Sequence, residues 1–285
     1  ASADGTYLAF GGYAQTLPST VNLPGATGST INRCVALVGG LGLPSYSIVA
    51  SSTSFFSTSN IRAVAANDKN NIWGTGGSQG VNYFGPASTP VNVQNTKTNL
   101  RAAAIFNNQL YFSAQVTSGT PTHVGVYTVG NGTPTTSGQT ASCIIVSTGT
   151  GSGTAQPNQF FFNSQNTICY VADGRTIANG GGIQKWVNSA GTWTLMYTLG
   201  TGTNSTAGAF GVVADFSATN PMVYATTSNS GSNRLIAIND IGAASDATTI
   251  ATAPSSNANF RGLAFSPCSL PQVALSSGSI VCANN

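Results

Sequence analysis

One hairpin-like segment recurs along this chain, and it limits the possible folds more than any other feature. Residues 60–77, NIRAVAANDKNNIWGTGG, return with variations as NLRAAAIFNNQLYFSAQ at 99–115 and as NFRGLAFSPCSLPQVALSSG at 259–278. Each copy has a run of small and branched apolar residues, a polar turn and a second apolar run. The copies predict a repeat protein built from β-hairpins, and they indicate architecture more strongly than function.

Further apolar runs follow these hairpins, so the predicted strands fall into groups of four. The groups begin about every 40 to 50 residues along the chain. The four complete groups are 61–66, 72–75, 81–84 and 91–94; 100–106, 110–114, 124–129 and 143–147; 159–163, 168–172, 183–187 and 193–199; and 210–216, 222–227, 234–239 and 248–251. The remaining predicted strands are 6–12, 33–38 and 46–51 before these groups, and 260–265, 273–276 and 280–282 after them.

Groups of four antiparallel strands at this spacing are typical of the blades of a β-propeller. Each small sheet is apolar on both faces and must stack against its neighbours, so the blades close into a ring. We therefore predict an all-β fold with one β-propeller domain over residues 1–285. Six segments resemble second strands, which predicts six blades, with five as the alternative. The blade-like units are about 1–58, 59–98, 99–154, 155–206, 207–256 and 257–285.

The first residues, ASADGTYLAFGGYA, resemble the second half of the repeated hairpin, with its turn at Asp4 and Gly5. Its partner strand is missing on the N-terminal side, and one interpretation is a leader segment that this sequence does not include. Two arrangements remain open for the ends of the ring. Residues 260–265 pair with residues 6–12 and close five blades, or a terminal blade is open or split and accepts a strand from another molecule.

Composition favours an extracellular protein. Charged residues make up 5% of the chain, Glu is absent, and the nine basic residues are scattered singly. Nucleic-acid binders cluster such residues on one face, so a nucleic-acid partner is not expected. No apolar run reaches the roughly 18 residues of a membrane-spanning helix, so no membrane span is expected. The low charge leaves little repulsion between copies and permits self-association.

Several segments resemble, in the same order, a family of uncharacterised secreted microbial β-propeller proteins. They include SADGTYLAFGGYA, VNLPGATGSTINRCVALVGG, NIRAVAANDKNNIWGTGGSQGVNYFG, FNNQLYFSAQ, GGIQKWVNSAGTWTLMYTL, MVYATTS and FRGLAFSP. The resemblance covers the chain from end to end. It implies an extracellular propeller with additional sequence before the SADG segment, and it implies no catalytic residue.

Five cysteines allow more than one pairing. A disulfide between Cys268 and Cys282 would pin the C-terminal segment, and a loop of this length contributes about 3 kcal/mol. Cys143 and Cys169 are a weaker candidate pair in successive blades. Cys34 is then expected to be a buried, small hydrophobic residue. The chain has no CxxC motif and one histidine, so no zinc site is predicted.

Arg62, Arg101 and Arg261 occupy equivalent positions in three copies of the repeat. If the first strands line the axis, these arginines form a partial basic ring at one end of it, which could hold an anion or an acidic sugar. Alternatively, each arginine caps backbone carbonyls between blades, beside an asparagine that makes the turn. The second interpretation is favoured, because the fourth and fifth repeats carry Phe161 and Gly211 instead.

No catalytic residue, metal ligand or cofactor is predicted. The loop around Asp68 offers one carboxylate, whereas calcium sites use several, so a plain hairpin turn is expected. The six aspartates are dispersed, which matches neither the paired carboxyl groups of glycosidases nor the metal site of lactonase-like propellers. His123 lacks a nucleophile-elbow motif nearby, so we expect it to be structural.

Aromatic side chains and sequons are the remaining candidates for contact with sugars. Trp73, Trp186 and Trp193, with Tyr197, could stack on sugar rings, but we expect them to fill the space between blades. Two N-glycosylation sequons begin at Asn131 and Asn204, both in loops between predicted strands.

These features together predict a secreted structural or adhesive protein, a subunit that self-assembles into a fibre or surface layer. Its partners are expected to be copies of itself, held by strand or blade-edge contacts, and glycans are further candidate partners. The alternative is a carbohydrate- or anion-binding propeller module near the three repeat arginines. A metal-assisted hydrolase or lactonase is the second alternative.

Overall fold

The computed structural model describes residues 1–16, 20–39, 46–85, 90–119, 121–202, 205–255 and 258–267. In these ranges the protein is almost entirely β-structure, with one short 3-10 helix, η1 (Ile177–Asn179). The first sheet has three strands in the order β1-β2-β3, and four further sheets have four strands each. All neighbouring strands within a sheet pair antiparallel.

The strands follow chain order within each sheet. The first sheet contains β1 (Tyr7–Tyr13), β2 (Arg33–Gly39) and β3 (Tyr46–Ser52). The second contains β4 (Ile61–Ala66), β5 (Ile72–Gly76), β6 (Val81–Tyr83) and β7 (Val91–Gln94). The third contains β8 (Leu100–Phe106), β9 (Gln109–Ala114), β10 (Gly125–Val129) and β11 (Ala141–Val146). The fourth contains β12 (Pro157–Phe162), β13 (Ile168–Asp173), β14 (Gly182–Ser189) and β15 (Thr192–Leu199), and the fifth β16 (Ala209–Asp215), β17 (Met222–Thr227), β18 (Arg234–Asn239) and β19 (Ala247–Thr252).

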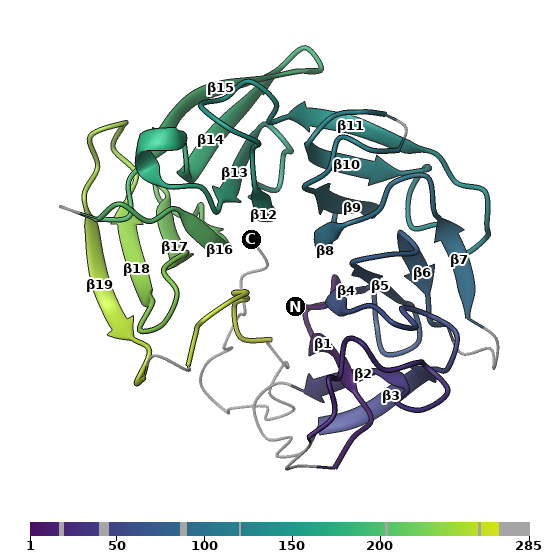
Figure 1. Ribbon diagram of the computed structural model, residues 1–285. Helices are drawn as coiled ribbons and strands as arrows, with labels where there is room; N and C mark the ends of the chain where they lie inside the picture. Colours follow the sequence, from purple (N-terminus) through teal and green to yellow (C-terminus); the bar gives the residue numbers. More distant parts are fainter. Residues whose placement is uncertain are drawn as a thin grey trace, which may run out of the picture.

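The five sheets stand around a central axis, with the first strand of each four-stranded sheet nearest the axis and the last strand on the rim (Figure 1). This is a β-propeller, and the predicted fold class is confirmed. The prediction of six blades is wrong, because the described residues form five sheets, which was the alternative. The count of six treated the strand that became β1 and the segment at 273–278 as second strands of separate blades. The latter segment lies outside the described residues.

The apolar core is divided among the joints between blades. Four clusters of buried side chains occur among the described residues, and each joins two successive sheets. The cluster between the second and third sheets, for example, contains Trp73, Leu100 and Phe112. The second, third and fourth blades thus bury both faces of their sheets against their neighbours, as the repeat pattern predicted, whereas the first and fifth each contribute one face to a cluster.

Each innermost strand of the four-stranded sheets has a β-bulge near its beginning. The register of pairing shifts between Ile61 and Ala63 in β4, and between Leu100 and Ala103 in β8. It shifts again between Pro157 and Phe160 in β12, and between Ala209 and Gly211 in β16. A bulge re-aims the side chain of the extra residue and often lies beside a functional site.

The segment 258–267 lies at the centre of the molecule, between the fifth and first sheets (Figure 1). The strand predicted at 260–265 is not observed, since no strand is assigned there. The segment is held by side chains instead: the amide of Gln159 bonds to both backbone groups of Leu263, and Thr226 Oγ1 donates to the carbonyl of Arg261 at 2.6 Å. The two ends of the ring therefore meet without a described β-ladder.

The three cysteines within the described ranges, Cys34, Cys143 and Cys169, are free. The weaker proposed pair, Cys143 with Cys169, is wrong because the two thiols belong to different joints of the ring. Burial raises the pKa of Cys143 to about 11, so its thiol stays protonated. Cys34 is buried, as predicted. The proposed disulfide between Cys268 and Cys282 lies outside the described residues.

Candidate functional site

Three arginines gather where the inner strands begin. Arg62 lies in the bulge of β4, Arg101 lies in the bulge of β8, and Arg261 lies in the segment beside β16. Arg62 donates to Asn99 and Leu100, the two residues that precede Arg101. Burial lowers the pKa of Arg62 and of Arg101, and repulsion lowers each further, from Arg101 on Arg62 and from Arg261 on Arg101. The structure therefore brings together the three arginines that occupy equivalent positions in the repeats.

Arg62 donates some of its hydrogen bonds to the next blade. Its Nη1 donates to the side-chain oxygen of Asn99 at 2.5 Å and to the carbonyl of Leu100 at 3.3 Å. Asn99 has a φ of 53°, a left-handed conformation that asparagine tolerates better than most residues. Burial, and then repulsion from Arg101, lower the pKa of Arg62 to about 10. This arginine fits the capping interpretation of the sequence.

Arg101 is half-buried and has no hydrogen-bond acceptor among the described residues. Its Nε is buried without a partner. Burial, followed by repulsion from Arg261, lowers the pKa of Arg101. A guanidinium group carries five N–H donors, so this side chain can bind an acceptor that the described chain does not supply.

Arg261 stacks its guanidinium over the ring of Phe210, with 4.5 Å between Cζ and the ring centroid. Its side chain is exposed. A cation over an aromatic ring keeps its N–H groups directed outward around the ring's edge, where they can donate to a ligand.

The bulges also correct the repeat alignment. The residues that correspond to the arginines are Asn158 and Gln159 in β12 and Phe210 in β16. Phe161 and Gly211 are therefore not the equivalents.

A second polar cluster joins the fourth and fifth blades and was not found by sequence analysis. Lys185 Nζ forms an ion pair with Asp240 Oδ2 at 2.9 Å and donates to the hydroxyl of Tyr197 at 3.0 Å. Asp240 also accepts hydrogen bonds from Tyr197 and Tyr170. The four residues are far apart in sequence and share no motif. Asp240 is 3% exposed, so the cluster acts as a structural clamp.

The tryptophans have the structural role expected of them. Trp73 and Trp186 are 1% and 4% exposed, and the indole N–H of each donates a hydrogen bond. Neither ring can stack on a sugar without unfolding its blade joint. Trp193 is half-buried and packs edge-on against Phe162 at 5.4 Å between ring centroids.

The remaining candidates lie apart from the arginines. Asp68 accepts hydrogen bonds from the backbone N–H groups of Asn70 and Asn71, which is the predicted hairpin turn. His123 is exposed, and its backbone carbonyl accepts a hydrogen bond from Tyr127. Asn131 is exposed in the turn between β10 and β11, so its side chain is accessible for glycosylation. Asn204 lies outside the described residues.

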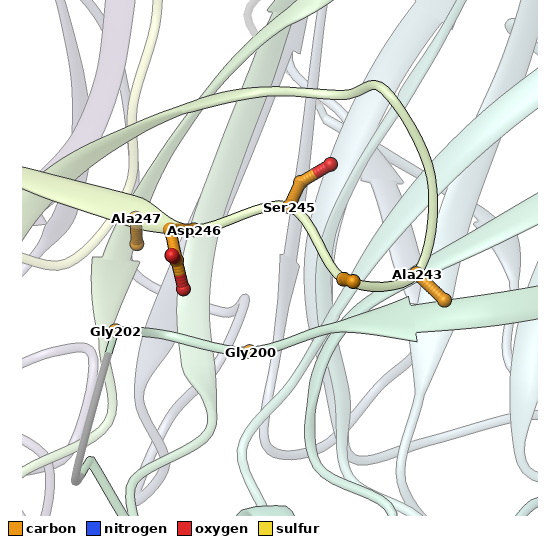
Figure 2. Close-up of a pocket in the computed structure, with 7 residues that line it drawn as sticks. Gly200, Gly202, Ala243, Ser245, Asp246 and Ala247 are labelled. Atoms are coloured by element: carbon orange, nitrogen blue, oxygen red, sulfur yellow. The ribbon is translucent and has the colours of Figure 1, made fainter.

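Two shallow hollows occur at the sides of blades. One, of about 200 Å³, lies where residues 243–247 cross the segment containing Gly200 and Gly202 (Figure 2). The other, of about 250 Å³, is lined by residues 93–96 and 138–141. Both are smaller than the roughly 300 to 1,000 Å³ of typical ligand sites, and neither contains a repeat arginine.

Within the described ranges, no three side chains of His, Cys, Asp or Glu are grouped so that they could hold a metal ion. The described part of the chain also contains no helix with the length and apolar character needed to cross a membrane.

Comparison with known proteins supports no assignment beyond the fold. No protein-family model and no curated protein sequence matches the chain. Solved structures that resemble it include the extracellular domain of a B. thetaiotaomicron protein assigned as a hybrid two-component system, with 12% identity over 80% of this chain and 26% of that chain and a TM-score of 0.47. A hypothetical selenium-binding protein from Sulfolobus tokodaii shares 12% identity over 79% of this chain and 58% of its own, with a TM-score of 0.49.

A Bacteroides fragilis protein assigned as a 6-phosphogluconolactonase shares 12% identity over 88% of this chain and 68% of its own, with a TM-score of 0.46. The chain spans about a quarter of the length of the first of these proteins. The β-propeller fold expected from the sequence is the fold observed. The fold itself follows from the order of the strands in the five sheets.

Proposed function

We propose that this protein is an extracellular structural or adhesive subunit whose copies associate by strand addition at the inner edge of β1. One observation carries the proposal: β1 belongs to the one three-stranded sheet, and among the described strands it pairs with β2 alone. A strand edge with free backbone groups readily pairs with a strand from another molecule.

The beginning of β1 shows which backbone groups face this edge. Tyr7 donates its N–H to Ser2 Oγ at 2.9 Å, and its carbonyl accepts from the N–H of Ser2 at 2.7 Å. The chain before the turn therefore lies along the inner edge of β1 at Tyr7. Because alternate residues of a strand direct their hydrogen bonds to the same edge, Ala9 and Gly11 offer theirs on this side. These positions are where an added strand would pair.

Surface composition also supports association. Phe10, Ile48 and Val49 of the first sheet are 47%, 56% and 40% exposed, so this blade presents large apolar side chains to solvent. The whole chain has nine basic and six acidic residues, which leaves little charge repulsion to oppose contact between copies. The lack of Glu and the wealth of Ser, Thr, Asn and Gly fit an extracellular protein.

The test is negative-stain electron microscopy of the full chain and of an Ala9→Pro variant. Proline removes the N–H that Ala9 offers at the inner edge of β1, so we expect ordered filaments from the native chain and none from the variant. An Ala9→Ser variant keeps the N–H and should still form filaments. Thermal melting confirms that each variant is folded. Monodisperse particles from the native chain, or filaments unchanged by Ala9→Pro, would contradict the proposal.

A further inference from the structure

Within the described part of the chain, no ion pair balances the charges of the axial arginines. The two ion pairs among the described residues join Arg175 to Asp173 and Lys185 to Asp240. Of the three axial guanidinium groups, only that of Arg62 donates hydrogen bonds within the described chain. Arg101 and Arg261 thus present donors and positive charge at one end of the axis, with no acceptor for their side chains among the described residues.

Other buried arginines of the same chain are fully provided with acceptors. Arg33, which is 0% exposed, donates to the carbonyls of Pro24, Ala26, Ile31 and Ser59. Arg175 is held by both carboxylate oxygens of Asp173 and by further oxygen atoms. The fold therefore satisfies an arginine where the role is structural.

The arrangement of the axial arginines also costs free energy in the unliganded protein. A buried polar group without a partner is destabilising, and Arg101 Nε is such a group. Like charges that repel at short range add to this cost, and the lowered pKa values of Arg62 and Arg101 reflect burial first and then this repulsion. A single negative group between the arginines would relieve both effects.

We propose that Arg62, Arg101 and Arg261 form an anion-binding site at the end of the axis where the inner strands begin. Its ligand is an oxyanion group, carried as the carboxylate of an acidic sugar or as a sulfate. Arg101 and Arg261 donate to the oxyanion, and Arg62, anchored on Asn99, contributes charge from the neighbouring strand.

The chemistry of the donors selects this class of ligand. A guanidinium group presents parallel N–H donors that match two oxygens of a carboxylate or sulfate. A neutral sugar offers hydroxyl acceptors but cannot offset three positive charges. The site is built from β4, β8 and the segment 258–267, and its test does not depend on whether copies of the chain assemble.

Isothermal titration calorimetry of the full-length protein tests the site, with sodium sulfate and tri-galacturonate as separate titrants. We expect at least one to bind, and Arg101→Gln to weaken binding about 10- to 100-fold, as expected for loss of a charge-assisted hydrogen bond. Arg234→Gln is the matched control, because it removes the same charge from an arginine that donates to Thr201 in the fifth blade. It should leave the affinity unchanged.

Two further measurements separate binding from a structural role. Without ligand, Arg101→Gln should melt at the same or a higher temperature than the native chain, since it removes repulsion and an unsatisfied donor. Arg101→Lys keeps the positive charge but loses the parallel N–H donors of the guanidinium group, and should bind the ligand less tightly than the native chain. Binding of sulfate alone or of galacturonate alone identifies the source of the oxyanion. Absence of binding by both, or equal weakening by Arg234→Gln, would overturn the proposal.

Discussion

Single charged residues in this protein fall into two kinds, those the fold neutralises and those it does not. Asp240 is the clearest neutralised case, with hydrogen bonds from Tyr170, Tyr197 and Lys185. Burial alone would raise the pKa of Asp240, but these three partners outweigh it and lower the pKa. The buried carboxylate is therefore charged in the folded protein, and it ties two blades together.

Replacing Asp240 with Asn should destabilise the protein by about 3 kcal/mol or more, because it leaves Lys185 without its buried counter-charge. Urea unfolding at neutral pH, with the fluorescence of the tryptophans as the signal, measures this change. Asp246→Asn is the control: Asp246 is exposed, and its loss should change the free energy of unfolding by less than about 0.5 kcal/mol.

The lowered pKa of Asp240 predicts that the stability of the native chain depends on pH. The folded-state pKa of Asp240 is below its usual value of 3.8, so its stabilising contribution is complete above that value. It is lost as the pH falls through the folded-state pKa. The native chain should therefore lose more stability than Asp240→Asn on acidification. Equal losses would show that Asp240 does not hold the two blades together through its charge.

At the level of strands, hydroxyl groups connect two of the bulges, those of β8 and β16, to the part of the ring that follows. Ser113 Oγ accepts from the N–H of Ala102 in its own blade and donates to the carbonyl of Asn158 in the next. Thr226 Oγ1 accepts from Gly211 N–H at 2.8 Å and donates to the carbonyl of Arg261 at 2.6 Å. The carbonyl of Arg261 thus accepts the hydrogen bond that the carbonyl of Asn158, in the inner strand β12, accepts at the joint between the third and fourth blades.

Thr226→Val should release this link and destabilise the protein by about 1 to 3 kcal/mol, because it leaves a buried N–H and a carbonyl unpaired. Thr75 offers a matched control, since it is equally buried on the second strand of its blade but its hydroxyl has no partner. Thr75→Val should therefore be neutral or stabilising. Thermal melting and limited proteolysis within residues 258–267 measure both. Equal destabilisation by the two substitutions would contradict the proposed link.

The sequence predicted the strands closely, and five of them, β4, β7, β8, β17 and β18, begin and end where they were expected. Strands are local and depend on runs of apolar residues between turns. The bulges could not be predicted, because they depend on pairing between strands. For that reason Gln159 and Phe210 were missed as residues at the positions equivalent to the arginines. Lys185 and Asp240 were missed because two blades must stack before they meet.

Considered as a whole, the ring has joints of unequal character. Four joints are filled by clusters of buried apolar side chains. Between the fifth and first sheets lies the segment 258–267, attached by hydrogen bonds from Gln159, Thr226 and Asn233. Its Phe265 contacts Phe161 and Tyr224 but remains 41% exposed. This joint is therefore expected to be the weakest.

Native-state hydrogen exchange should resolve this difference. We expect amides of 258–267 and of β1 to exchange first, with a smaller opening free energy than those of β8 and β12. Mass spectrometry of peptides from deuterated protein measures the order. Simultaneous exchange of all inner strands would indicate that the ring unfolds as one unit and that the joint is no weaker than the others.

The segment 258–267 carries Arg261, so the stability of the joint between the fifth and first sheets affects the position of this positive charge. Arg62 and Arg101 lie on the inner strands β4 and β8, whereas Arg261 lies on a segment without an assigned strand that is held by side-chain hydrogen bonds. If that joint loosens, the aperture around the axis widens and the distance between Arg261 and Arg101 grows. The distances between the three positive charges then depend on how firmly the segment 258–267 is held, so the stability of this joint would set the geometry of the proposed anion site.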